Sequence, residues 1–130
     1  MENRRILIDT SIVIDYLRRQ DKSDTKFVKL FKNNELCLSA ISVFELYNGA
    51  TNESKKMDIE TICNNVEIID FDLNTAKLAS EVYRNLRLKN KLIEFRDILI
   101  SSAAIQYILP IATLNVKHFE RIDNLQLINL

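Results

Sequence analysis

Apolar residues follow two alternating patterns along this chain. Short apolar runs, typical of strands, are separated by longer segments in which apolar residues recur every three or four positions, as in amphipathic helices. The predicted strands cover residues 6–8, 35–39, 66–69, 110–113 and, at an edge, 127–128. The predicted helices cover residues 12–20, 25–32, 42–48, 52–65, 72–89, 96–108 and 116–122. This alternation predicts an α/β fold with a mainly parallel sheet of four or five strands and helices on both faces.

Residues that favour helix capping occur at the starts of several predicted helices. Thr10 or Ser11 is a candidate N-cap for the first helix. Asp72 is a candidate N-cap for the long helix after the third strand. Ser42 and Glu45 have the spacing of a capping box. The chain has one glycine and one proline, which favours helices with short connections over a turn-rich all-β fold.

The composition is that of an ordinary globular domain. The 130 residues are 47% hydrophobic and 28% charged, and no internal repeat or interdomain linker stands out, so we expect residues 1–130 to form one domain. The formal net charge is zero, so a polyanionic partner can be inferred only from a local patch. Asp9 interrupts the first apolar run, and no apolar window is long enough to span a bilayer comfortably. We therefore expect a soluble, cytoplasmic protein without a membrane partner.

The cysteines and the histidine argue against a zinc site of the finger type. Cys37 and Cys63 lack metal-ligand spacing, and His118 is the only histidine. Cys37 lies in an apolar run, so we expect it to be a buried free thiol, in keeping with a reducing cytoplasm.

Three carboxylates differ in context from the acids of loops and helix surfaces. Asp9 ends the first predicted strand, Glu45 lies one turn into the helix after the second, and Asp97 opens the apolar helix before the fourth. A strand's end and the next helix's start share one edge of an alternating α/β sheet, so Asp9 and Glu45 are expected to meet. Asp97 joins them if its helix starts at that edge. The simpler interpretations are an N-cap for Asp9, a capping box for Glu45 and a helix-dipole interaction for Asp97.

Carboxylates gathered in one crevice repel one another, so some must bind protons or share a cation. The candidate ligands are carboxylates, with no cysteine or histidine beside them in the sequence. The expected ion is therefore a hard cation such as Mg²⁺ or Mn²⁺. Mg²⁺ keeps several waters and engages substrate phosphates. The sequence therefore favours phosphoryl transfer at a metal site.

Four segments of the chain, three of which contain the acids discussed above, form a recognisable set when they are taken together. They are Leu7-Ile8-Asp9-Thr10-Ser11, Ser42-Val43-Phe44-Glu45-Leu46, Asp97-Ile98-Leu99-Ile100-Ser101-Ser102-Ala103 and Thr113-Leu114-Asn115-Val116-Lys117-His118-Phe119. In this order, and across the whole chain, they resemble the successive motifs of PIN-domain ribonucleases, most closely VapC-type toxins of type II toxin–antitoxin pairs. The resemblance implies a three-layer α/β/α sandwich and a Mg²⁺- or Mn²⁺-dependent endoribonuclease that leaves 5′-phosphate and 3′-hydroxyl ends. It also implies a homodimer and a VapB-like antitoxin that blocks the site, in a heterotetramer or larger complex.

The resemblance carries over to individual positions. The residues that match the family's metal-binding acids are Asp9, Glu45 and Asp97, with a hydroxyl from Thr10 or Ser11 in support. Asn115 stands where many PIN domains have aspartate. An amide oxygen can bind a metal or its water but brings no charge, so we expect one metal ion more securely than two.

Basic residues near the third and fourth motifs are candidate contacts for the RNA backbone, because phosphate contacts supply most sequence-independent affinity. The candidates are Arg84, Arg87, Lys91, Arg96 and Lys117, in stretches that also hold Lys89 and Arg121. A solvated helix face is the alternative for each. We expect His118 at the rim or packed in its short helix rather than as a general base, and Tyr47 and Phe119 in the core or an interface.

Two other functional classes remain open. A non-catalytic or weakly active module that binds RNA or a partner is favoured if Asn115 weakens the metal site. A Mg²⁺-dependent phosphatase of the haloacid dehalogenase type also has an acid after its first strand. That chemistry needs a second aspartate two residues later, where this chain has Ser11. The favoured prediction is an endoribonuclease whose catalytic residues are Asp9, Glu45, Asp97 and Asn115.

Overall fold

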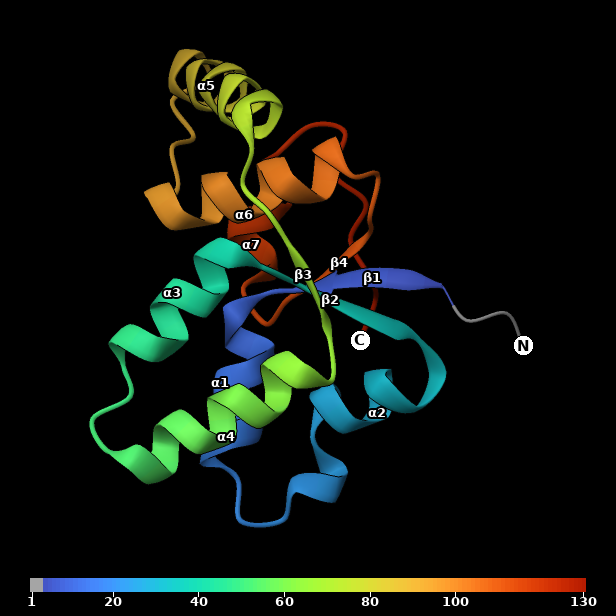
Figure 1. The fold of residues 1–130 in the computed structure, drawn as a ribbon. Helices are drawn as coiled ribbons and strands as arrows, with labels where there is room; N and C mark the ends of the chain where they lie inside the picture. Colours follow the sequence, from blue (N-terminus) through green and yellow to red (C-terminus); the bar gives the residue numbers. More distant parts are fainter. Residues whose placement is uncertain (1–3) are drawn as a thin grey trace.

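The computed structural model describes residues 4–130, in which short strands alternate with helices (Figure 1). The strands are β1 (Arg5–Ile8), β2 (Glu35–Ser39), β3 (Glu67–Ile69) and β4 (Ile111–Ala112). The helices are α1 (Thr10–Arg18), α2 (Lys26–Asn33), α3 (Ala40–Asn48), α4 (Glu53–Asn64), α5 (Leu73–Leu88), α6 (Phe95–Gln106) and α7 (Val116–Phe119), with a 3₁₀ turn at Lys22–Asp24. Within this part of the chain, no helix is both long and apolar enough to cross a bilayer.

The four strands form one parallel sheet in the order β3-β2-β1-β4. Ile8 of β1 is level with Leu38 of β2 and with Ala112 of β4, so three strands end together at one edge. The edge strand predicted at 127–128 is reduced to a single bridge between Leu127 and Ile111, because β4 is too short to offer a longer ladder. The predicted parallel sheet is confirmed.

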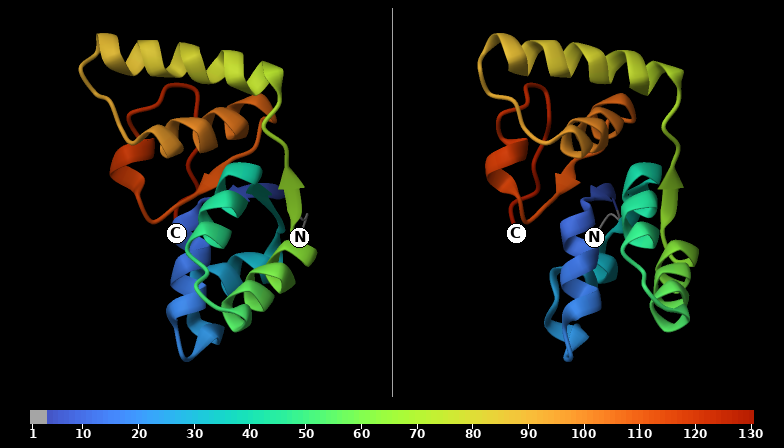
Figure 2. Two further views of the ribbon diagram at one scale, coloured as in Figure 1. Left: turned by 60° about the vertical axis from the view of Figure 1, so that its left-hand side comes forward. Right: turned by 90° about the vertical axis from the view of Figure 1, so that its left-hand side faces the viewer.

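Alternate side chains of the strands point to opposite faces of the sheet, and this divides the core in two. Ile6 and Ile8 pack with residues of α1, α2 and α4, whereas Leu7 and Cys37 pack with residues of α5 and α6. Figure 2 shows α5 and α6 on one side of the sheet and α1, α2 and α4 on the other. The three-layer α/β/α sandwich is therefore confirmed. Cys37 is a fully buried free thiol, as expected.

Helix α1 begins directly after β1, which changes its predicted cap. Asp9, rather than Thr10 or Ser11, occupies the N-cap position, with an extended backbone. Its side chain makes no capping hydrogen bond, so the carboxylate is not used as a helix cap. The long helix α5 begins as predicted, with Asp72 accepting the Thr75 N–H at 2.9 Å.

Helix α3 also follows its strand without a connection. Its N-cap is Ser39, whose hydroxyl accepts the Ile41 N–H at 3.1 Å. The capping box predicted for Ser42 and Glu45 is therefore wrong, because the helix starts almost one turn earlier. Ser42 is instead fully buried inside the helix. The side chain of Glu45 therefore takes no part in capping the helix.

The two aromatic residues singled out in the sequence have different environments. Phe119 of α7 is fully buried in the core, as predicted. Tyr47 of α3 is 40% exposed, so it lies outside the core, and its role in an interface stays a prediction.

Candidate active site at the carboxyl edge of the sheet

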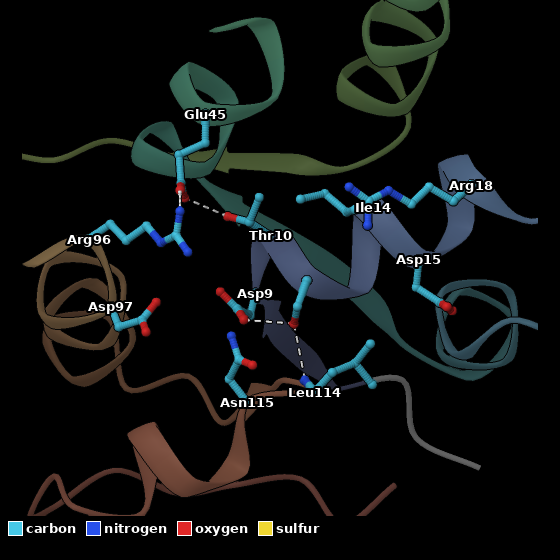
Figure 3. Close-up of a pocket in the computed structure, with 11 residues that line it drawn as sticks. Asp9, Thr10, Ile14, Asp15, Arg18, Glu45, Arg96, Asp97, Leu114 and Asn115 are labelled. Carbon is cyan, nitrogen blue, oxygen red and sulfur yellow. Dashed lines mark hydrogen bonds and ion pairs between the residues drawn. The ribbon is translucent and has the colours of Figure 1, made fainter. Parts of the chain in front are cut away.

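A pocket of about 400 Å³ opens where β1, β2 and β4 end. Its lining includes the four residues expected to be catalytic, Asp9, Glu45, Asp97 and Asn115. They come from four segments: the end of β1, the second turn of α3, the first turn of α6 and the loop after β4 (Figure 3). The rest of the lining comprises Thr10, Ser11, Ile14, Asp15, Arg18, Arg96 and Leu114. The fold thus brings the four predicted residues to one pocket.

Asp9 is held in place by two hydroxyls. Ser11 Oγ and Thr113 Oγ1 lie 2.7 and 2.8 Å from Asp9 Oδ2, and each donates to it. These hydroxyls are themselves fixed, because Ser11 Oγ accepts the Leu114 N–H and Thr113 Oγ1 accepts the Asn115 N–H. Asp9 is only 2% exposed. Its carboxylate is therefore buried and oriented, with Oδ1 free of these two bonds.

Asp97 is equally buried, at 2% exposure, on the first turn of α6. Its Oδ2 lies 2.8 Å from His118 Nδ1 of α7. Burial raises the pKa of Asp97, the hydrogen bond from His118 opposes that rise, and the charge of Asp9 adds to it. The two acids are therefore close enough for the charge of one to disfavour ionisation of the other.

Glu45 has partners that the other two acids lack. Its Oε2 lies 3.0 Å from Nη1 of Arg96, and its Oε1 accepts a hydrogen bond from Thr10 Oγ1 at 2.8 Å. Thr10 Oγ1 is also 2.7 Å from the buried Ser42 Oγ. Thr10 therefore positions Glu45 in this structure, whereas Ser11 positions Asp9.

The donor set favours a hard cation on two of the acids rather than on three. No three acidic, histidine or cysteine side chains in residues 4–130 lie close enough together to hold one metal ion. The pocket brings all three acids together, but Glu45 is engaged by Arg96. Asp9 and Asp97 are two buried carboxylates, and Asn115 adds an amide oxygen. Mg²⁺ commonly binds one or two protein carboxylates and keeps several waters, so these residues fit such an ion.

Several contributors to the pocket were not selected as site residues from the sequence. Thr113 and Ser42 act through hydrogen bonds to distant residues, which no local spacing reveals. Asp15 and Arg18 line the pocket from the same face of α1 as Ser11, and their spacing of i, i+4 and i+7 was the available signal. His118 does not itself line the pocket, but its Nδ1 contacts Asp97 from behind the lining, and 36% of its side chain is exposed.

The basic residues proposed to contact RNA are spread over several surfaces. Arg96 lines the acidic pocket, whereas Arg84 lies in a separate apolar groove between α5 and α6. Arg87 and Lys91 are exposed on and after α5. Lys117 is exposed on α7, two residues from Asn115. The sequence stretch from 84 to 96 therefore does not form one continuous lining of the pocket.

Comparison with known proteins gives a consistent result. The sequence matches the PIN domain family over residues 6–125. Ribonuclease VapC2 of Rickettsia felis is 31% identical over 128 residues, which cover 95% of this chain and 96% of that protein. Ribonuclease VapC1 of Methanocaldococcus jannaschii is 29% identical over 121 residues, covering 93% and 83%.

A solved structure agrees with the sequence matches. It is VapBC2 from Rickettsia felis bound to a DNA fragment from their promoter, with a TM-score of 0.83 and 27% identity. The similarity covers 97% of this chain and 98% of that one. At the position where a dehalogenase-type phosphatase needs its second aspartate, Ser11 donates a hydrogen bond to Asp9 instead. The fold, the acidic pocket at its strand ends and the match over nearly the whole chain lead to one conclusion: this chain belongs to the PIN-domain family, and within it to the VapC type.

Proposed function

We propose that this protein is a metal-dependent endoribonuclease, that it is the toxin of a type II toxin–antitoxin pair, and that it acts in the cytoplasm. The observation that carries the proposal is the pair Asp9 and Asp97, two buried carboxylates in one pocket at the strand ends of a PIN domain. The curated relatives named above are ribonucleases, which supports the same activity here.

In this proposal, the residues around Asp9 and Asp97 determine which carboxylate oxygens remain available to bind the metal ion. Ser11 and Thr113 occupy Oδ2 of Asp9, and His118 occupies Oδ2 of Asp97. The remaining carboxylate oxygens and the amide oxygen of Asn115 would hold Mg²⁺ or Mn²⁺. Such an ion supplies Lewis acidity, because it lowers the pKa of water and offsets the negative charge that develops at phosphorus. Asp9 and Asp97 need their outer hydrogen bonds for this role, because partners of this kind orient metal-binding carboxylates.

We further propose that positive side chains at the rim of the pocket hold the RNA backbone. Arg18 and Arg96 both line the pocket, and 53% of the Arg96 side chain is exposed. Lys117 is exposed close by on α7. Contacts of this kind bind phosphate without reading sequence. Arg84, Arg87 and Lys91 would act only on a longer RNA that extends along α5.

The antitoxin and oligomer proposals draw support from exposed apolar surface. Phe44 of α3 and Phe95 of α6 are each 68% exposed and line a shallow pocket beside the acids. A groove of about 540 Å³ along α5 and α6, lined by residues such as Tyr83 and Leu99, extends this surface. Apolar patches of this type mark interaction sites. We propose that they serve a VapB-like antitoxin and a homodimer, in a heterotetramer or larger complex.

The activity is tested with the purified chain, freed of any bound antitoxin, and a structured RNA. We expect cleavage with Mg²⁺ or Mn²⁺, no cleavage in EDTA, recovery when Mn²⁺ is restored, and 5′-phosphate ends on the products. A folded protein that binds RNA or a partner but never cuts with Mn²⁺ is instead the non-catalytic module. The toxin role is tested in cells, where co-expression of the neighbouring small open reading frame should relieve growth arrest.

A further inference from the structure

Glu45 has a protein partner at each carboxylate oxygen. Arg96 Nη1 lies 3.0 Å from Oε2, and Thr10 Oγ1 donates to Oε1 at 2.8 Å. Arg96 is anchored a second time, because its Nη2 lies 3.0 Å from Glu94 Oε2. The side chain of Glu45 is only 16% exposed. This is therefore a largely desolvated carboxylate with a guanidinium aimed at it, unlike a fully exposed pair of low energetic value.

Arg96 also belongs to the acidic pocket by position. It directly precedes Asp97 on the first turn of α6, and Figure 3 shows its guanidinium beneath the Glu45 carboxylate, on the side of Asp9 and Asp97. Partial burial opposes the charged guanidinium, but the charges of Glu45, Glu94 and Asp97 outweigh this effect and raise the pKa of Arg96. Arginine stays charged at all relevant pH values, so the pocket contains a permanent internal cation.

We propose that Arg96 is a counterion that keeps Glu45 out of the ligand set of the divalent metal ion. The pocket then divides its acids between two cations, with the metal on Asp9 and Asp97 and the guanidinium on Glu45. This inference rests on the proposed function, since it presupposes a metal at Asp9 and Asp97. It makes Arg96 a positioning residue that restricts the site to one ion.

The charges in the pocket explain why the guanidinium matters for metal affinity. A guanidinium near the bound ion repels it, and this repulsion is weakly screened in a partly buried pocket. Replacing Arg96 by alanine removes that repulsion and leaves the Glu45 carboxylate with Thr10 as its remaining partner. A largely buried carboxylate without a positive partner is stabilised strongly by a nearby cation. In the Arg96→Ala variant, Glu45 would therefore bind the metal ion.

The test is a double-mutant cycle on metal binding, read without RNA. Mn²⁺ affinity is measured by electron paramagnetic resonance of free Mn²⁺ for wild type, Arg96→Ala, Glu45→Gln and the double variant. We expect Arg96→Ala to bind Mn²⁺ roughly tenfold more tightly. Glu45→Gln should weaken binding less than about threefold in the wild-type background and about tenfold or more in the Arg96→Ala background.

Arg4→Ala is the matched control. Arg4 is an exposed arginine just before β1, at the opposite end of that strand from Asp9, so its loss removes the same charge far from the pocket. Mn²⁺ affinity should stay close to wild type in this variant, and circular dichroism checks that all the variants fold.

The possible results separate the two proposals. Glu45→Gln weakening Mn²⁺ binding equally in both backgrounds would overturn the counterion role of Arg96 and leave the metal site intact. An Arg96→Ala affinity no higher than that of Arg4→Ala would do the same. Absence of Mn²⁺ binding in all the folded proteins would overturn the metal site itself, and the inference with it.

Discussion

Thr113 and Asp9 are 104 positions apart in the sequence, yet Thr113 Oγ1 donates a hydrogen bond to Asp9 Oδ2 at 2.8 Å. The sheet makes this contact possible, because the Asp9 N–H bonds to the carbonyl of Ala112 at 2.9 Å and aligns the ends of β1 and β4. The orientation of the first acid therefore depends on a hydroxyl from the residue directly after the last strand.

Replacing Thr113 by valine should lower RNA cleavage by roughly 10- to 100-fold, the usual cost of losing an outer hydrogen bond at a metal site. Asp9 would lose one of its two hydroxyl donors, and the Asn115 N–H would lose its acceptor. Single-turnover cleavage at saturating Mn²⁺ measures the effect. Thr61→Val, at an exposed position on α4, is the control, and an equal loss in both variants would contradict the specific role of Thr113.

Asp9→Asn should abolish cleavage while leaving the fold intact. The amide keeps an oxygen that can accept from Ser11 and Thr113, but it removes the negative charge proposed to hold the cation. Gel-based RNA cleavage and thermal unfolding are measured together. Asp70→Asn is a matched control, because Asp70 also follows a strand of the sheet but is exposed and does not line the acidic pocket. Normal cleavage by a folded Asp9→Asn protein would reject the role of Asp9 as a ligand of the catalytic metal ion.

Asn115→Asp should raise the affinity for Mn²⁺ by roughly tenfold, since affinity for hard cations increases with the number of charged ligands. Asn115 is exposed at the pocket rim, so the new carboxylate carries little burial cost. Titration calorimetry with Mn²⁺ measures the change. Asn85→Asp, on the exposed face of α5, adds the same charge elsewhere and should have little effect. Equal affinities in the two variants would argue that Asn115 does not face the ion.

Asp72 should make the stability of the fold sensitive to acid. Hydrogen bonds from the Thr75 backbone N–H and then from its hydroxyl lower the pKa of Asp72 in the folded state. Because the pKa of Asp72 is lower in the folded state, its stabilisation of the fold is complete above the pKa of the unfolded state, about 3.9. The stabilisation is lost as the pH falls through the pKa of the folded state. Urea unfolding at neutral and acidic pH measures this loss. Asp72→Asn retains a capping oxygen without a titratable group, so its stability should fall less with acid.

The order of the elements and the placement of Asp9 could be predicted because both follow from strand patterns. Once Ile8 and its neighbours form buried parallel strands, the acid after β1 must lie at their shared carboxyl edge. Asp97 was expected to join Asp9 only if its helix starts at that edge, and the structure meets this condition, because Asp97 on the first turn of α6 lines the same pocket. Neither placement depends on the rotamer of a side chain.

The pairing of Glu45 could not be predicted in the same way. Its partner, Arg96, comes from a helix on the other side of the pocket, and the spacing of Ser42 and Glu45 suggested a local cap instead. His118 was likewise placed at a rim without a named partner, because its contact with Asp97 spans 21 positions. Such pairs depend on how the helices α3, α6 and α7 approach one another, and no periodicity in the sequence encodes that.

The contact between Thr113 and Asp9 also has a consequence for the order in which the site forms during synthesis. Asp9 and Glu45 are made early in synthesis, together with Ser11, but the second hydroxyl on Asp9 and the histidine that contacts Asp97 come from residues 113–118. A nascent chain on the ribosome thus carries Asp9 and Glu45 before their later partners, Thr113 and Arg96, have been made. The proposed nuclease site can therefore be completed only after Thr113 and His118 have been synthesised.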